Sequence, residues 1–320
     1  MKRSCKGPRT MSESLFISVI IPTLGRPQYL SRTVADLQSQ SYTNAEIIVV
    51  DQSVEPEVIN PVAPAPSRLP VQYLRDRGSG AARARNIGIL AAKGDILLFL
   101  DDDVEIPGAD FILEHARAYA NPSVGGVCGR TIELRADWAN CRSKVASTSR
   151  PVVYPIICLP SGDASFKTEG FSNSVKGSNM SFRADLLRAI GGFDERFGFP
   201  CIYEETVVAL KICNRGHRIL FCPKAMVYHI GAPSGGQRVH ALNADRRFVA
   251  YRDRVLLFVN NCPRWQFPLF LLGNLLLAVR PLVQFRGRDV SRACAGLFTG
   301  IRKYLLPGKS SQSYAKGRVS

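Results

Sequence analysis

The sequence predicts an α/β fold, with a doubly wound, mostly parallel sheet flanked by helices and a helical basic C-terminal extension. Three observations lead to this prediction. Apolar runs of strand length alternate with segments of helical periodicity, a pattern typical of parallel sheets. Two of these runs end on carboxylates, at Asp51 and at Asp101, and such sheets bind ligands beyond the carboxyl ends of their strands. Beyond residue 235 the chain becomes basic and helical in character.

In the first half the sequence predicts strands that alternate with helices, except that a loop joins the second and third strands. β-rich apolar runs predict the strands, and we expect Pro22 to stop the first of them. Leucine and valine at helical spacing predict one helix, and an alanine-rich segment predicts a second. The proline-rich stretch 55–70 is predicted to be a loop. The expected strands cover residues 17–21, 46–51, 71–74 and 95–100, and the expected helices cover 30–37 and 80–92.

The second half is less regular. We expect a helix from about Ala184 to the glycines at 191–192, a helix over 205–215 closed by Gly216, and a strand over 219–221 before Pro223. The predicted organisation is a basic tail at 1–14, one domain at 15–235 and a basic helical region at 236–320. The domain is expected to divide into a nucleotide-binding half at 15–105 and an acceptor half at 106–235.

The net charge of +16 is unevenly distributed. Residues 13–235 carry 23 basic and 23 acidic side chains, whereas residues 236–320 carry 15 basic and three acidic ones. A neutral body argues against a nucleic-acid partner, and a basic terminal region suits an anionic membrane surface. The nine scattered cysteines include no CxxC pair, which argues against a disulfide framework or a zinc module and fits a reducing cytoplasm. We expect no secretory signal.

Three consecutive carboxylates, Asp101 to Asp103, follow a predicted buried strand. Alone, such a run is more often a solvated acidic turn, but its place at a strand end in a βαβ pattern favours a metal site. In an extended chain Asp101 and Asp103 point the same way, and hard oxygen ligands suit Mg²⁺ or Mn²⁺. The glycines at 78 and 80 lack the third glycine of a dinucleotide fingerprint, because Arg83 stands in its place, and the predicted helix after them contains no GKS or GKT motif. Redox and P-loop functions are therefore disfavoured.

Several motifs, taken in order, resemble glycosyltransferase family 2, whose members have the GT-A fold. The first four match its nucleotide-sugar half: 18–23 (SVIIPT), 49–51 (VVD), 84–88 (ARNIG) and 99–103 (FLDDD). The others match its acceptor half: 177–183 (GSNMSFR), 191–195 (GGFDE), 204–205 (EE) with 215–216 (RG), and 228–229 (YH). The resemblance covers about residues 15–235, and it is the succession of motifs that makes it specific.

The resemblance implies a nucleoside diphosphate sugar as donor and Mg²⁺ or Mn²⁺ as cofactor. Asp101 and Asp103 form its DxD site, and His229 is a further candidate metal ligand. Glu205 stands where the family places its catalytic base, with Glu204 as the alternative. The residues expected to hold the donor are Pro22, Thr23, Asp51, Arg83, Arg85, Asp101, Asp102, Asn179 and Met180.

The chain also departs from the family pattern. Gln52 occupies a position where a second Asp is common, and Glu205 replaces the usual Asp. The leading hypothesis is an inverting, metal-dependent glycosyltransferase that acts on a hydroxyl of a polysaccharide or a lipid-linked glycan. The alternative is a catalytically weak or inactive nucleotide-sugar-binding protein with a membrane- or partner-docking basic tail.

Residues 265–279 form an uncharged segment between Arg264 and Arg280. At ~1.5 Å per residue it is too short for the ~30 Å hydrocarbon core of a bilayer. Two alternatives fit the segment about equally: an interfacial helix or hairpin on an anionic membrane, or a helix packed on the catalytic body. The expected location is cytoplasmic, peripheral at the inner face of the membrane.

Overall fold

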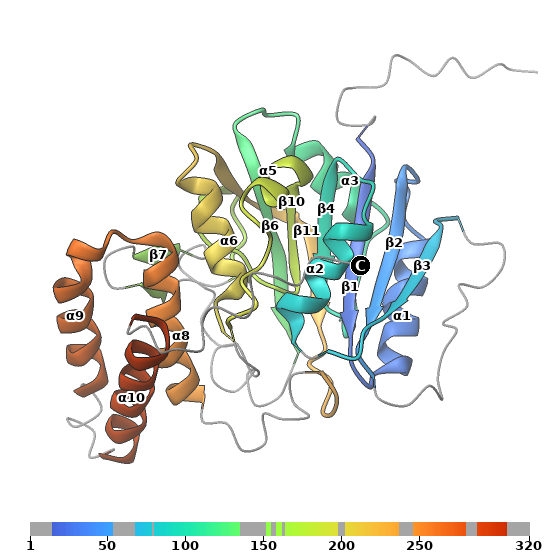
Figure 1. The fold of residues 1–320 in the computed structure, drawn as a ribbon. Helices are drawn as coiled ribbons and strands as arrows, with labels where there is room; N and C mark the ends of the chain where they lie inside the picture. The colour runs from blue at the N-terminus through green and yellow to red at the C-terminus, as the bar shows by residue number, and fades with distance from the viewer. Residues whose placement is uncertain are drawn as a thin grey trace, which may run out of the picture.

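The computed structural model describes residues 15–53, 68–78, 80–134, 152–154, 158–161, 164–197, 202–236, 246–279 and 287–305. Within these ranges the chain forms a central sheet covered by helices, with further helices beside it (Figure 1). The strand order is β3-β2-β1-β4-β10-β6-β11-β5, and β9 also pairs with β11. The strands of this sheet are β1 (Ile17–Thr23), β2 (Ala45–Asp51), β3 (Val71–Arg75), β4 (Ile96–Leu100), β5 (Val104–Glu105), β6 (Val124–Glu133), β9 (Gly170–Ser172), β10 (Asn179–Arg183) and β11 (Arg218–His229).

The helices follow the strands in the expected alternation in the first half and dominate the C-terminal part. A separate two-stranded sheet is formed by β7 (Val152–Tyr154) and β8 (Leu159–Ser161). The helices are α1 (Pro27–Gln38), α2 (Ala81–Ala91), α3 (Phe111–Ala118), α5 (Ala184–Ala189), α6 (Glu204–Cys213), α8 (Arg246–Asn261), η2 (Arg264–Gln266), α9 (Phe267–Val279), α10 (Gly287–Gly300) and η4 (Ile301–Leu305).

The sheet is mostly parallel, as predicted. β1 pairs in parallel with β2 and β4, β2 pairs in parallel with β3, and β6 pairs in parallel with β11. β10 runs antiparallel to both β4 and β6, so the strands on its two sides point the same way. The carboxyl ends of β1, β2, β3, β4, β6 and β11 therefore meet at one edge of the sheet.

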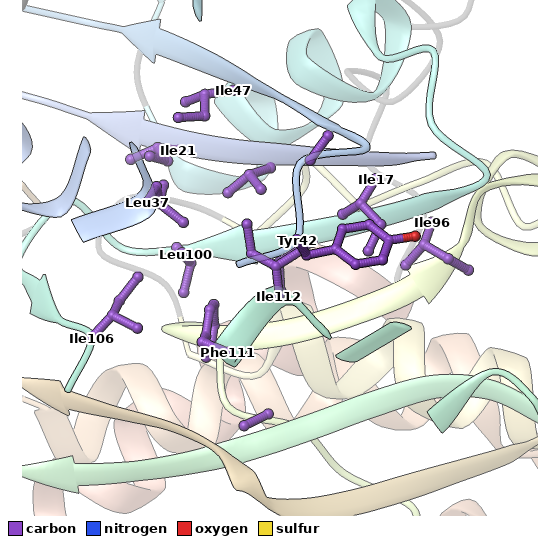
Figure 2. Close-up of a cluster of buried hydrophobic side chains, with 14 of the residues drawn as sticks. Ile17, Ile21, Leu37, Tyr42, Ile47, Ile96, Leu100, Ile106, Phe111 and Ile112 are labelled. Atoms are coloured by element: carbon purple, nitrogen blue, oxygen red, sulfur yellow. The ribbon is translucent and has the colours of Figure 1, made fainter. Parts of the chain in front are cut away.

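Each face of the sheet is covered by its own apolar core. β1 shows why: Ile17, Val19 and Ile21 pack on one face, and Ile20 packs on the other. This period-two alternation is the geometry of a strand buried on both sides. The first core, shown in Figure 2, joins the sheet to α1 and α3. The second joins it to α2, α5 and α6.

Two expectations about prolines are wrong. β1 does not stop at Pro22 but continues to Thr23, because its pairing with β4 ends at Ile20 and leaves no ladder on that side for Pro22 to interrupt. β11 does not end before Pro223 but runs on to His229. Its register against β6 shifts between Cys222 and Met226, and a bulge of this kind accommodates a proline within a sheet.

The C-terminal helices pack beside α6 instead of on the sheet (Figure 1). A third apolar core joins Val207 and Leu210 of α6 to side chains of α8, α9 and α10. The division of the chain at residue 235 stays a prediction. Among the described residues, no helix is both long enough and apolar enough to cross a membrane.

Candidate active site

The carboxyl edge of the sheet brings together the acidic residues that the sequence analysis singled out. Asp101 follows β4 directly, and Asp103 lies just before β5. His229, the last residue of β11, is paired with Val104 of β5 on one side and with Glu133 of β6 on the other. Strand register alone therefore places the imidazole beside the acidic turn, although 126 residues separate Asp103 from His229 in sequence.

Asp101, Asp103 and His229 form a compact cluster of possible metal ligands. One ligand atom from each lies within 4.8 Å of the others. The Nε2 atom of His229 is 3.1 Å from Asp103 Oδ1 and 3.7 Å from Asp101 Oδ2. The side chain of Asp103 is 1% exposed and that of Asp101 is 30% exposed, so the cluster opens to solvent on the Asp101 side. Two carboxylates and an imidazole form a donor set that suits Mn²⁺ or Mg²⁺.

Glu133 fixes the orientation of His229. Its Oε2 atom accepts a hydrogen bond from His229 Nδ1 at 2.8 Å, while its Oε1 atom pairs with Lys176 Nζ at 2.9 Å. With Nδ1 held in this way, Nε2 points at the two aspartates. Burial alone would lower the pKa of His229, but the hydrogen bonds with Asp103 and Glu133 outweigh it and raise this pKa to about 10. The same contact with His229 helps to lower the pKa of Glu133 to about 2, against the effect of burial.

Asp102 is buried and is not one of the three clustered residues. It accepts hydrogen bonds from Thr23 Oγ1 at 2.6 Å and from Arg26 Nη1 at 3.0 Å. Burial raises the pKa of Asp102 to about 6 despite the neighbouring Arg26. In this structure Asp102 therefore anchors the acidic turn, and its predicted contact with the donor stays a prediction.

Arg26 ties the acidic turn to the segment after β11. Its Nη1 atom lies 3.2 Å from Asp103 Oδ2, and its Nε and Nη2 atoms donate to the carbonyl oxygens of Ser234 and Gly235. Asp103 Oδ2 also accepts from the backbone N–H of Ala232 at 2.8 Å. Burial would raise the pKa of Asp103, but the hydrogen bond from His229 and the charges of His229 and Arg26 lower it overall.

A chain of ion pairs, centred on the buried Arg85, leads from the cluster of possible metal ligands to the candidate base. Arg85 on α2 lies 3.6 Å from Asp101 Oδ1 through Nη2 and donates to Glu204 Oε1 through Nη1 at 2.9 Å. The side chains of Arg85 and Glu204 are 3% and 5% exposed. The Nε atom of Arg85 has no hydrogen-bond partner among the described residues. Its guanidinium also lies over the ring of Phe193, 5.4 Å from the ring centre.

Glu204 and Glu205 open α6, and their side chains hydrogen bond to each other. The two have opposite electrostatic environments. Burial would raise the pKa of Glu204, but Arg85 lowers it, so Glu204 is held as a carboxylate. The loss of solvent around its carboxyl group and the neighbouring Glu204 raise the pKa of Glu205. The residue as a whole remains partly exposed. A Cβ on Gly177 would lie 3.0 Å from Arg85 Nη2 and 3.8 Å from Glu205, so the backbone packs closely here.

The predicted nucleoside-binding residues lie at the same edge, on the ends of β1 and β2. Thr23 and Asp51 are paired in register, next to Pro22. Asp51 is buried, and its carboxylate accepts hydrogen bonds from the backbone N–H and hydroxyl of Ser53 and from the Tyr73 hydroxyl. Their contact with a nucleoside stays a prediction.

Arg83 lies apart from this cluster. Its guanidinium pairs with Asp76 at 3.0 Å, and Gln52 donates to the same carboxylate. Its side chain is 47% exposed. Arg83 and Arg85 are on one helix, but only Arg85 reaches the acidic cluster.

Asn179 and Met180 begin β10 and are fully buried. The Nδ2 atom of Asn179 donates to the carbonyl oxygens of Arg130 and Ala225, and its Oδ1 atom accepts from His115 Nε2 at 3.0 Å. Asn179 thus bonds to both strands, β6 and β11, that position Glu133 and His229. Its predicted contact with the donor sugar stays a prediction.

Two residues of the site, Arg26 and Glu133, were missed by the sequence analysis. Glu133 carries the signal used for Asp51 and Asp101, a carboxylate at the end of a strand. That strand was not expected. Arg26 follows a glycine in the β1–α1 loop, and nothing in its local pattern points to a partner 76 residues away.

Comparison with known proteins supports this description of the fold. The family model described as Glycosyl transferase family 2 matches residues 18–170. The O-antigen chain rhamnosyltransferase RfbN of Salmonella typhimurium is 20% identical over 67% of this chain, which spans 66% of that relative's length.

Solved glycosyltransferase structures have a similar fold. The mannosyltransferase PcManGT of Pyrobaculum calidifontis, solved with GDP-Man and Mn²⁺, superposes with a TM-score of 0.57 at 19% identity, covering 89% of this chain and 74% of that one. TarS 1-349 of S. aureus, solved with UDP-GlcNAc, gives a TM-score of 0.53 at 15% identity, covering 89% of this chain and 91% of that one. Residues 18–170 therefore match glycosyltransferase family 2, and the chain has the GT-A fold.

Proposed function

We propose that the protein transfers a glycosyl group from a nucleoside diphosphate sugar to a hydroxyl group, with inversion at the anomeric carbon. The match of residues 18–170 to the family model and the neighbours solved with GDP-Man or UDP-GlcNAc support this donor class. The observation that carries the proposal is the chain Asp101–Arg85–Glu204–Glu205, buried at Arg85 and Glu204, which joins the cluster of possible metal ligands to a carboxylate of raised pKa.

On the donor side, Asp101, Asp103 and His229 are proposed to hold the divalent metal. Once bound, a divalent metal neutralises the charge of the departing diphosphate. Arg85 adds positive charge beneath the same site and holds Asp101 and Glu204 in position. Arg26 keeps Asp103 in place through its contacts with the segment after β11.

On the acceptor side, Glu205 is proposed as the catalytic base. It takes the proton of the acceptor hydroxyl while that oxygen attacks the anomeric carbon and the bond to the diphosphate breaks. A single displacement of this kind inverts the configuration. Because the pKa of Glu205 is raised, its ionised form is a stronger base than an ordinary carboxylate, and kcat/KM should rise with pH through the neutral range.

The proposed acceptor is a glycan, either part of a polysaccharide or linked to a lipid. The support is the resemblance to a relative named as an O-antigen chain rhamnosyltransferase. Such an acceptor offers a sugar hydroxyl, which is the group that a carboxylate base can deprotonate.

The test is a panel of nucleoside diphosphate sugars incubated with the protein, Mn²⁺ and glycan acceptors, with release of the nucleoside diphosphate as the readout. We expect one donor to be consumed only with metal present. Glu205→Gln should still bind that donor but lose transfer by ~10² or more, because a general base acts only in the chemical step. Glu114→Gln, on α3 and paired with Arg117, is the matched control. Full activity of Glu205→Gln would refute the assignment of the base, and failure of every donor to bind would refute the function.

A further inference from the structure

Helix α9 has two faces of different character. Phe270, Asn274 and Ala278 are fully buried and face the C-terminal core. On the opposite side, together with the preceding η2, lies a continuous row that we name the apolar stripe. Its members and their exposed fractions are Trp265 (72%), Leu269 (50%), Leu272 (57%), Leu275 (40%), Leu276 (62%) and Val279 (40%).

The apolar stripe follows helical periodicity. Steps of three and four residues lead from Trp265 through Leu269, Leu272 and Leu276 to Val279, which places them along one side of the helix. A surface helix normally shows polar residues to water, but α9 contains no charged residue at all. Single exposed apolar side chains are ordinary, whereas a contiguous row marks an interaction surface. Figure 1 shows α9 at the outer side of the C-terminal helices, away from the sheet.

The charge of the C-terminal region indicates what covers the apolar stripe. Arg264, directly before the stripe, is exposed, and residues 236–320 carry 15 basic and three acidic side chains. Two of these acidic residues lie in the described part of the region. Asp253 is fully buried, and Asp289 pairs with Arg247 at 3.3 Å.

We propose that the apolar stripe docks on an anionic lipid bilayer, with α9 lying in the plane of the interface and its leucines inserted among the acyl chains. Anionic headgroups complement Arg264 and the basic excess of the C-terminal region, and the stripe supplies the apolar contact that an interfacial helix needs. A second copy of this chain fits less well, because its own cations would face those of the first. The sequence left two alternatives for this segment, a helix packed on the body and an interfacial helix on a membrane. In this proposal each describes one face of α9.

The inner face of α9 is fixed to the rest of the protein by polar contacts. Arg254 of α8 donates to Asn274 Oδ1 at 3.1 Å. The adjacent Asp253 accepts from the backbone N–H of Ile202 at 3.0 Å, two residues before α6 begins. Docking through the apolar stripe therefore orients the whole body on the membrane. The docking itself does not depend on the proposed function.

The experiment is flotation of the full chain with vesicles, without donor or metal. Phosphatidylcholine vesicles are compared with vesicles that also contain phosphatidylglycerol. We expect binding to the anionic vesicles only, and a decrease of at least about tenfold in the bound fraction for the double variant Leu272→Gln/Leu276→Gln. Both side chains are exposed, so the variant should fold, which circular dichroism checks. Leu90→Gln on α2, where Leu90 is 86% exposed, is the matched control and should bind like the wild type.

A second readout locates the contact. The chain has two tryptophans, so Trp138→Phe leaves Trp265 as the single emitter. Its fluorescence should shift to shorter wavelength when anionic vesicles are added. Unchanged vesicle binding by Leu272→Gln/Leu276→Gln would overturn the proposal, as would equal binding to neutral vesicles. The proposal would also be overturned if the wild type bound no vesicles and instead formed a dimer, and if Leu272→Gln/Leu276→Gln made that dimer dissociate.

Discussion

Arg85→Met should destabilise the protein strongly, because it removes the cation that compensates a buried carboxylate. Arg85 Nη1 and Glu204 Oε1 are 2.9 Å apart, and both side chains are almost completely buried. Without Arg85, Glu204 must remain ionised in the interior or take up a proton. Breaking a buried pair by removing one partner costs about 3–5 kcal/mol.

An independent estimate gives the same magnitude. Protonating Glu204 at pH 7 from its ordinary pKa of 4.5 costs about 3 kcal/mol, and at pH 5 it costs less than about 1 kcal/mol. The free energy of unfolding of Arg85→Met should therefore lie about 3 kcal/mol below that of the wild type at pH 7, and this deficit should shrink by about 2 kcal/mol at pH 5. Urea denaturation at the two pH values measures both quantities.

The double variant Arg85→Met/Glu204→Met is the decisive control. Replacing a buried ion pair by apolar side chains of similar volume is often nearly neutral. The double variant should therefore be more stable than Arg85→Met alone, although neither is expected to transfer sugar. A loss below about 1 kcal/mol in Arg85→Met, or strictly additive losses in the double variant, would refute the reasoning.

Two further predictions concern His229, through its partner Glu133, and His115. Glu133→Gln keeps the shape of the group that orients His229 but removes its charge, so the affinity for Mn²⁺ measured by calorimetry should fall about 10–100-fold in a variant that circular dichroism shows to be folded. Unchanged affinity would show that Glu133 does not position the ligand. Burial keeps His115 neutral and lowers its pKa to about 4. The contribution of the neutral imidazole to the free energy of unfolding is therefore complete above the unfolded pKa of about 6.5 and is lost as the pH falls towards 4. The full loss is about 3 kcal/mol, and the variant His115→Gln should lack this part of the pH dependence of urea unfolding; identical profiles would contradict the assignment.

The first half of the fold could be predicted closely because its signals are local. The apolar runs at 46–51 and 96–100 are buried on both faces, so their continuous hydrophobicity identified them. The strand β6 carries no such signal, because it contains three glycines. Packing explains why glycine stands at two of these positions. A Cβ on Gly126 would be 2.7 Å from the Phe182 ring, and one on Gly129 would be 2.3 Å from the Asn179 amide. Only the assembled sheet shows why glycine is required there.

The candidate site, too, combines residues with a local sequence signal and residues whose contacts arise only in the folded protein. Asp101, Asp103 and His229 could be predicted from motifs, and strand register then brings them together. The turn at 102–103 is not an extended strand, so the expected two-residue alternation is not what makes the aspartates converge. The partners Arg26 and Glu133 could not be predicted, because each contact joins segments that only the tertiary fold makes adjacent.

The central claim is that Asp101, Asp103 and His229 hold a divalent metal that binds together with a nucleoside diphosphate. Calorimetric titration of GDP, UDP and dTDP into the protein, with Mn²⁺ and after treatment with EDTA, tests it most directly. We expect one nucleotide to bind only with Mn²⁺ present, and Asp103→Asn to abolish this binding while circular dichroism shows an intact fold. Equal nucleotide affinity in EDTA, or unchanged Mn²⁺-dependent binding by a folded Asp103→Asn, would contradict it.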